Sequence, residues 1–207
     1  RDEDARGDRS PGEFYQLDME MAFADQEDVF AVLEDVLPPI FAKYGKYNTA
    51  STAPFRRIPY LEAMEKYGTD KPDLRIDLMV QDLTQLLSGC GFPPFENQRV
   101  KAVVVSGFEG SRKQIDKLCA DVEVQTGNKV YWFRYDEKGE LVGGISKFLQ
   151  PIKDLVVEAL TLAPGCLVGL SAGTLLAAQK TAGVFIKTVA PLCPAHFVKE
   201  RYEFCWI

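Results

Sequence analysis

A row of polar side chains near the N-terminus could bind a small charged molecule. Gln16, Asp18 and Glu20 alternate with apolar residues, as one face of a β-strand does. Side chains at every second residue of a strand lie about 7 Å apart, so this row could hold an ammonium group or a metal ion. The alternative is the solvated outer face of an ordinary antiparallel strand. Alternation by itself favours the solvated face.

The residues around this row predict one local unit. Residues 1–4 (RDED) are a charge cluster, and residues 5–13 contain the glycine, serine and proline that are typical of a loop. Apolar residues then recur at every second position from Tyr15 to Phe23. We therefore expect a strand end, a charged loop and a long return strand.

Two stretches closely resemble one enzyme family. Residues 1–20, RDEDARGDRSPGEFYQLDME, resemble motif 2 of the class II aminoacyl-tRNA synthetases, and in detail the bacterial-type aspartyl-tRNA synthetases. Residues 67–75, YGTDKPDLR, resemble a second run of the same enzymes. Two matches in the same order make the resemblance specific over the first part of the chain. The remainder is similar to the insertion domain of those enzymes, more loosely.

The resemblance implies that residues near the N-terminus bind ATP. A planar, permanently charged guanidinium can hold a phosphate oxygen and a carboxylate together, and this catalytic role would fall to Arg1. Glu3 would face the adenine amino group, and Phe14 would stack beneath the adenine. The implied ATP-binding set is Arg1, Asp2, Glu3 and Phe14.

The same resemblance implies a site for aspartate, bound by Arg1, Gln16 and Asp18. Asp18, with Gln16, would receive the α-ammonium group of the amino acid. Glu20 continues the polar row but has no implied role.

The loop of the motif would meet the acceptor end of tRNA. Arg6 and Arg9 are the implied contacts, as a local basic pair in an acidic chain. Ser10 stands where related sequences carry a glutamine before the loop proline, and Gly12 is an additional residue. The loop is therefore shifted by one residue relative to the family pattern.

The function implied is that of an aspartate–tRNA ligase. ATP would activate L-aspartate to aspartyl-adenylate, and the aminoacyl group would pass to the 3′ end of tRNA(Asp). The family implies ATP as a substrate, Mg²⁺ in the full-length enzyme, a homodimer and a cytoplasmic location. No protein metal site, bound cofactor, membrane or DNA partner is expected for this chain.

The chain is expected to be a fragment that runs from motif 2 through the insertion domain. It would lack motif 1, motif 3 and the anticodon-binding domain, and would therefore be inactive in isolation. The alternative is a non-catalytic module that contacts tRNA or another protein.

Composition sets outer limits on these interpretations. The 207 residues carry a formal charge of -6, so the chain has no footprint for nucleic-acid binding over a wide surface, and any RNA contact should be local. The five cysteines are odd in number and show no CxxC spacing. Reduced thiols are therefore expected rather than a disulfide framework or a zinc site.

The elements that must position the site begin with a helix. Asp25 is a suitable N-cap, and apolar residues at helical spacing follow as far as Phe41, predicting a helix packed on the sheet. Pro38-Pro39 should end or kink it. A short helix over Tyr60–Tyr67 should stop at Gly68.

The second part of the chain predicts alternating strands and helices. A breaker cluster at residues 88–94 precedes an apolar strand at 100–105, and Ser111 with Gln114 forms a capping box for the next helix. Further strands are expected at 129–135, 166–170 and 202–207, with helices at 151–160 and 172–188. Gly183 is a weak point of the last helix, and His196, the lone histidine, is expected to be structural.

The fold class predicted is α/β (α+β). Residues 1–80 would belong to the antiparallel-sheet catalytic core of a class II synthetase. Residues 81–200 would form an inserted mixed α/β domain resembling the GAD domain, and residues 201–207 a return strand into the core.

Overall fold

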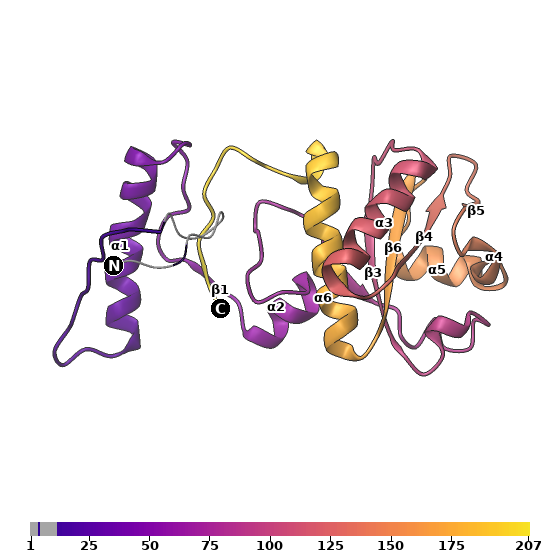
Figure 1. The fold of residues 1–207 in the computed structure, drawn as a ribbon, viewed down its shortest axis with the longest axis horizontal. Helices are drawn as coiled ribbons and strands as arrows, with labels where there is room; N and C mark the ends of the chain where they lie inside the picture. Colours follow the sequence, from indigo (N-terminus) through magenta and orange to yellow (C-terminus); the bar gives the residue numbers. More distant parts are fainter. Residues whose placement is uncertain (1–3, 5–11) are drawn as a thin grey trace.

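A computed structural model describes Asp4 and residues 12–207 of the chain. The molecule is elongated, with α1 near one end and a five-stranded sheet near the other (Figure 1). The helices are α1 Gln26–Tyr44, α2 Tyr60–Tyr67, α3 Arg112–Thr126, α4 Ser146–Leu149, α5 Lys153–Leu160 and α6 Leu175–Val189. The strands are β1 Arg56–Arg57, β2 Val80–Asp82, β3 Arg99–Val105, β4 Val130–Tyr135, β5 Leu141–Val142, β6 Cys166–Gly173 and β7 Cys205–Trp206. Short 3₁₀ turns occupy Pro93–Phe95, Gln150–Ile152, Ala190–Leu192 and Pro194–His196.

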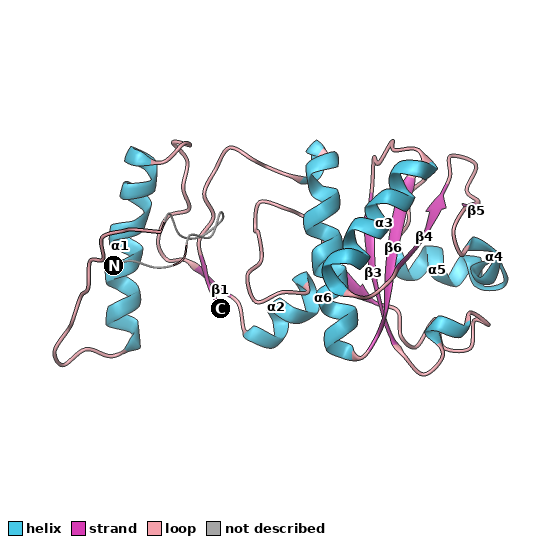
Figure 2. Ribbon diagram, viewed as in Figure 1, coloured by secondary structure: helices cyan, strands magenta, loops and turns pink. Residues whose placement is uncertain are grey.

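The main sheet has the strand order β2-β3-β6-β4-β5, and every neighbouring pair is antiparallel. The central strand β6 is buried from Cys166 to Ala172, because helices cover both faces of the sheet. α3 and α6 cover one face, and α4 and α5 lie against the other (Figure 2). The predicted fold class, a mixture of α and β with an antiparallel sheet, is confirmed.

Residues from the first half of the chain pair with its C-terminal segment in a separate small sheet between α1 and α2 (Figure 1). β1 pairs in parallel with β7, with Arg56 opposite Cys205. Single bridges join Ala50 to Tyr202 and Ile76 to Phe197. The residues that follow α1 are therefore held to the C-terminal segment by backbone hydrogen bonds.

Helix α1 begins as predicted and ends later than predicted. The Asp25 carboxylate accepts hydrogen bonds from the backbone N–H groups of Glu27 and Asp28, and the Asp28 side chain completes a capping box. The helix does not end at Pro38-Pro39 but continues to Tyr44.

Aromatic stacking joins α1 to the C-terminal segment. Phe30 stacks on Trp206 with ring centroids 4.0 Å apart, and Phe41 packs edge-on against Tyr202 and Phe204. Only Glu34 of this helix is buried, so the expectation of a core-facing helix packed on the sheet was wrong. Glu34 accepts hydrogen bonds from the backbone N–H of Phe55 and the indole N–H of Trp206, which satisfies its carboxylate.

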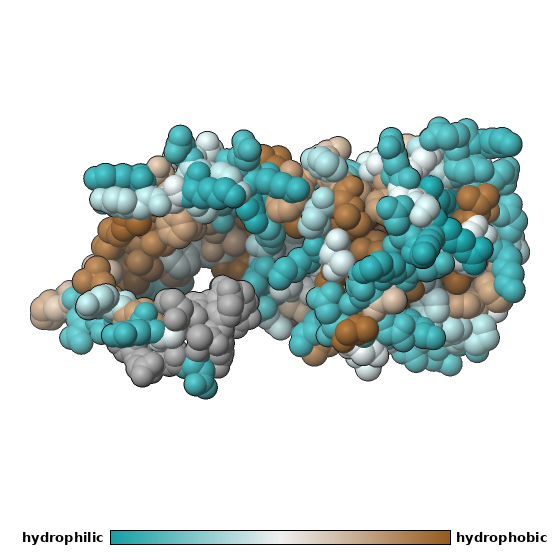
Figure 3. All heavy atoms as spheres, turned by 45° about the horizontal axis from the view of Figure 1, so that its top comes forward, coloured by the Kyte–Doolittle hydropathy of each residue, from teal (hydrophilic) through white to brown (hydrophobic). Residues whose placement is uncertain are grey.

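The predicted return strand is not formed. Residues 14–21 run without strand pairing, and Leu17 and Phe23 are fully exposed. Figure 3 shows such apolar side chains on the surface of the N-terminal part. An alternating pattern becomes a strand only where a neighbouring strand accepts its backbone hydrogen bonds, and no described strand lies beside this segment.

Helix α2 ends at Gly68, as predicted, with φ +67 and a hydrogen bond from the Gly68 N–H to the Met64 carbonyl. There the chain touches α6, backbone against backbone. A Cβ atom on Gly183 would lie 2.8 Å from the carbonyl oxygens of Tyr67 and Gly68. The glycine predicted to be a weak point of α6 is thus the residue that lets α2 approach it.

Candidate functional site

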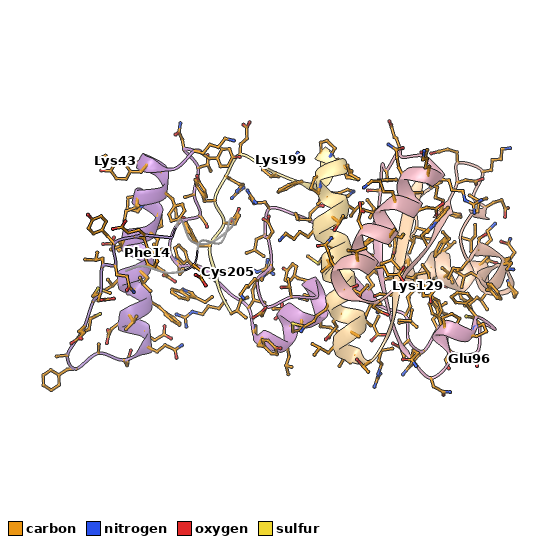
Figure 4. All side chains as sticks on the ribbon, in the orientation of Figure 1. Phe14, Lys43, Glu96, Lys129, Lys199 and Cys205 are labelled. Atoms are coloured by element: carbon orange, nitrogen blue, oxygen red, sulfur yellow. The ribbon has the colours of Figure 1, made fainter. Side chains whose placement is uncertain are left out.

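The sequence-predicted site lies mostly outside the described residues. Five of its members, Arg1, Asp2, Glu3, Arg6 and Arg9, are among the residues that the structure does not describe. Phe14, Gln16 and Asp18 are described, in the extended segment that precedes α1. Phe14 is labelled in Figure 4. Phe14 is half-buried, and Asp18 is exposed to solvent. Their proposed roles in binding ATP and aspartate stay predictions.

The second family-like run forms a compact polar turn after α2. The Lys71 N–H donates to the Thr69 hydroxyl, and the Arg75 guanidinium donates to both carboxylate oxygens of Asp73 at 2.7 and 2.8 Å. Burial raises the pKa of Asp73, but the hydrogen bonds from Arg75 outweigh it and leave that pKa below its ordinary value. The turn is therefore fixed by local ion pairing as well as by its proline.

This turn borders a large cavity. The cavity has a volume of about 1200 Å³ and lies between residues 67–78, helix α6 and residues 201–204. It is large enough for a cofactor-sized molecule. No sequence pattern indicates this cavity, because its walls come from segments about one hundred residues or more apart.

Sequence reasoning also missed a buried lysine. Lys101 lies in the apolar run of β3, yet its side chain is fully buried and its ammonium group pairs with Glu65 and Asp82, the latter at 2.8 Å. Glu65 also accepts a hydrogen bond from the Gln179 side chain. This network joins α2, the sheet and α6.

His196 has partners that its sequence neighbours do not reveal. Its Nδ1 lies 2.6 Å from the Asp77 carboxylate, and its Nε2 lies 2.8 Å from the Ser106 hydroxyl and 3.1 Å from the Ser106 carbonyl oxygen. The order Ser–His–Asp is that of a hydrolase triad. However, Nε2 faces the Ser106 carbonyl oxygen as well as the hydroxyl, a geometry that ties the two segments together rather than aiming the ring at the serine alone. The contacts support a structural role.

We expect His196→Ala to lower the free energy of unfolding by about 1–2 kcal/mol, because it removes hydrogen bonds that tie three separate segments together. Ser106→Ala is the matched control. It removes one hydroxyl but keeps the carbonyl partner, so its cost should stay below about 0.5 kcal/mol. Urea unfolding of the two variants measures both values. Equal losses would mean that the ring itself does not tie the segments.

The described cysteines are not placed for redox or metal chemistry. All five are free thiols. Burial, with a smaller effect of Asp116, raises the pKa of Cys119 to about 12, so its reactive thiolate is suppressed. Within the described part of the chain, no three His, Cys, Asp or Glu side chains gather into a metal-binding group. None of the described helices has the length and apolar character needed to cross a membrane.

The family model for tRNA synthetases of class II (D, K and N) matches residues 1–207. The chain therefore belongs to the class II aminoacyl-tRNA synthetases, as the N-terminal motif predicted.

Individual relatives narrow the comparison. The aspartate–tRNA ligase of Streptomyces coelicolor is 42% identical over 210 residues. The aspartate–tRNA(Asp/Asn) ligases of Rickettsia bellii and of a Wolbachia species from Drosophila simulans are 38% and 37% identical. In each case the alignment covers 100% of this chain and 35% of the relative. The chain thus spans about a third of the length of the curated relatives that it matches.

Proposed function

We propose that this chain is part of an aspartate–tRNA ligase. The observation that carries the proposal is the alignment of the whole chain, at 37–43% identity, with relatives that bear that name. The reaction would join L-aspartate to ATP, release pyrophosphate and pass the aspartyl group to the 3′ end of tRNA(Asp). Both aspartate–tRNA and aspartate–tRNA(Asp/Asn) ligases occur among these relatives, and their names alone favour neither for this chain.

Within this reaction, we assign the residues near the N-terminus to substrate binding. Arg1 would stabilise the negative charge that develops at the α-phosphate, because a guanidinium offers several fixed donors to phosphate oxygens. Asp2, Glu3 and Phe14 would hold the nucleotide. The N-terminal motif supports these assignments.

The remaining assignments concern aspartate and tRNA. Gln16 and Asp18, with Arg1, would fix the amino acid so that its carboxylate faces the α-phosphate. Arg6 and Arg9 would contact the acceptor end of tRNA. Asp18 is exposed in the described segment, so a ligand can reach its carboxylate.

Other features of the reaction rest on the family alone. ATP would be a substrate accompanied by Mg²⁺, the enzyme would act as a homodimer, and the reaction would take place in the cytoplasm. The described residues hold no carboxylate cluster that fits a metal ion, so we assign no residue to Mg²⁺ and derive no step from it.

We also infer that the chain is divided into two structural parts. Residues 1–80 and 201–207 would belong to the catalytic core, and residues 81–200 would form a GAD-like insertion. The pairing of β1 with β7 supports the first part of this division, since it joins residues 56–57 to 205–206 across the intervening chain. The strands β3, β4, β5 and β6, which all fall between residues 99 and 173, support the second.

Asp18→Asn in the full-length protein that contains this chain should lower kcat/KM for aspartate by about 10- to 100-fold in aspartate-dependent ATP–pyrophosphate exchange. The expected loss is that of one charge-assisted hydrogen bond, about 1.5–3 kcal/mol. Glu20→Gln is the matched control, because it also replaces a carboxylate by an amide, two residues further along the same polar row. It should change kcat/KM less than about twofold.

The two variants also separate the alternatives. Equal effects of Asp18→Asn and Glu20→Gln would refute the assignment of Asp18. A full-length protein with no exchange activity that still binds tRNA would refute the ligase proposal and support a tRNA-contact module. The 207-residue chain alone should show no exchange.

A further inference from the structure

Basic side chains are concentrated around the cavity beside α6. Five basic side chains line it: Lys71, Arg75, Lys180, Lys187 and Arg201. The whole chain has a net charge of -6, so this gathering runs against its overall balance. The residues that line it come mainly from α6, the loop that follows α2 and the C-terminal segment, which is drawn in yellow in Figure 1.

Two of the five cations are neutralised within the wall. Arg75 is paired with Asp73 at 2.7 Å, and Arg201 is paired with Glu203. Among the described residues, no carboxylate forms an ion pair with the remaining three, Lys71, Lys180 and Lys187. These exposed ammonium groups are therefore available to an anion.

Two lysines share one helix face. Lys180 and Lys187 are seven residues apart on α6, which places them about two turns, or roughly 10 Å, along the same side of the helix. Lys71 reaches the cavity from the turn opposite, next to the Asp73–Arg75 pair. An anion in the cavity would meet positive charge from two walls.

Two buried polar groups in the same wall lack partners. The Tyr67 hydroxyl and the Nε–H of Arg201 are buried and form no hydrogen bond within the described part of the chain. The Tyr67 residue is only 6% exposed. A buried, unsatisfied donor costs about 1–3 kcal/mol, and since both atoms are closed off from the cavity by neighbouring atoms, neither contacts a ligand there without a shift of the wall.

The rest of the wall is mixed. Leu74, Leu176, Val184 and Phe204 line the cavity beside polar side chains such as Gln125 and Thr126. A ligand with an anionic end and a flat or apolar part would fit these walls. A volume of about 1200 Å³ is ample for a molecule of nucleotide size.

We propose that this cavity binds a nucleotide, with its phosphate at Lys71, Lys180 and Lys187 and its base against the apolar part of the wall. None of the described members of the proposed substrate-binding set, Phe14, Gln16 and Asp18, lines it. The nucleotide is either free or the terminal residue of an RNA, since both present the same phosphate and base. The proposal does not depend on ligase activity.

Titration with AMP, GMP, CMP and UMP tests the proposal by isothermal calorimetry on the protein and on Lys180→Gln/Lys187→Gln. The double variant should weaken binding of the preferred nucleotide at least tenfold, the loss of about one charge-assisted hydrogen bond. Lys113→Gln/Lys138→Gln removes the same charge from exposed sites that do not line the cavity, and should change affinity less than about twofold. No binding of any of the four at about 1 mM, or equal binding by both double variants, would overturn the proposal.

One further variant distinguishes this cavity from the proposed ATP site. Binding that is lost in Phe14→Ala and retained in Lys180→Gln/Lys187→Gln belongs to the proposed ATP site and refutes the cavity site.

A short oligoribonucleotide, titrated in the same way, distinguishes a free nucleotide from the end of an RNA. Tighter binding than the mononucleotide, again lost in Lys180→Gln/Lys187→Gln, assigns the cavity to an RNA end. Binding no tighter than the mononucleotide assigns it to a free nucleotide. Both outcomes support the shared chemistry, and either one requires the two lysines.

Discussion

Gly68→Ala is expected to lower the free energy of unfolding by about 3 kcal/mol or more. Gly68 ends α2 with φ +67, a conformation that costs an L-residue about 1–2 kcal/mol. A Cβ atom there would also overlap the carbonyl oxygen of Gln179 and lie 2.6 Å from the backbone nitrogen of Gly183. Because these are backbone atoms of α6, they cannot rotate away, and such overpacking costs a further 1–3 kcal/mol or so. Urea unfolding measures the total.

Gly127→Ala separates the two causes. Gly127 ends α3 with φ +69 and the same type of cap, but a Cβ atom there would meet nothing within 4 Å. This variant should therefore cost only the conformational penalty, about 1–2 kcal/mol. The difference between the two variants measures the contact of α2 with α6. If Gly127→Ala is as destabilising as Gly68→Ala, the close approach of the two helices contributes nothing.

The same contact shows why one sequence prediction had the wrong sign. Gly183 was expected to be a weak point of α6, since glycine is about 1 kcal/mol worse than alanine in a helix. That comparison considers a helix alone. In the fold, the position faces the carbonyl oxygens of Tyr67 and Gly68, and only a residue without a Cβ fits there. Helix propensity is local, whereas the close approach joins residues 115 positions apart.

Local chemistry was predictable wherever the partners are close in sequence. The N-cap at Asp25, the capping box of Ser111 with Gln114, and the stop at Gly68 each involve residues no more than a few positions apart. The mixed α/β class followed from the same local periodicities. Element ends were less predictable, as α6 begins at Leu175 because β6 extends to Gly173.

Features that depend on distant partners were not predictable. The hydrogen-bond partners of His196, Asp77 and Ser106, lie 119 and 90 residues away in the sequence, and no pattern near the histidine predicts them. The predicted return strand also depended on a distant partner, and here the partner strand is missing among the described residues. Its alternation from Tyr15 to Phe23 is regular, but pairing needs a neighbouring strand, and none of the described strands lies beside it.

The candidate site divides in the same way. Its N-terminal half was predicted from a contiguous motif, and most of that motif lies outside the described residues. The cavity is described in detail but was invisible in the sequence, since Tyr67, Lys187 and Arg201 converge only through the fold. The residue type alone does not tell whether a lysine side chain faces a cavity, the solvent or, as for Lys101, the interior.

Lys101→Ala is expected to lower the free energy of unfolding by about 2–3 kcal/mol. Removing one member of a fully buried pair costs about 3–5 kcal/mol, and the value here is reduced because Glu65 and Asp82 remain half-exposed and can be hydrated. Lys101→Met is the matched control, because it keeps the volume and removes only the charge. It should cost about 1 kcal/mol, since well-packed apolar replacements of buried ions are tolerated.

The stability of Lys101→Met should fall less at acidic pH than the stability of the unaltered protein. Burial raises the pKa of Asp82, but hydrogen bonds from Lys101 and Thr84 outweigh it and hold that pKa below its ordinary value. A depressed carboxyl pKa contributes stability above the unfolded pKa, near 3.9, that is lost as pH falls through the folded pKa. Lys101→Met removes the main cause of the depression. The loss of stability between about pH 5 and pH 2 should therefore be smaller in Lys101→Met than in the unaltered protein. If the urea midpoint falls by the same amount across that range in both proteins, Lys101 does not hold Asp82 and does not fasten β2 to β3 through its charge.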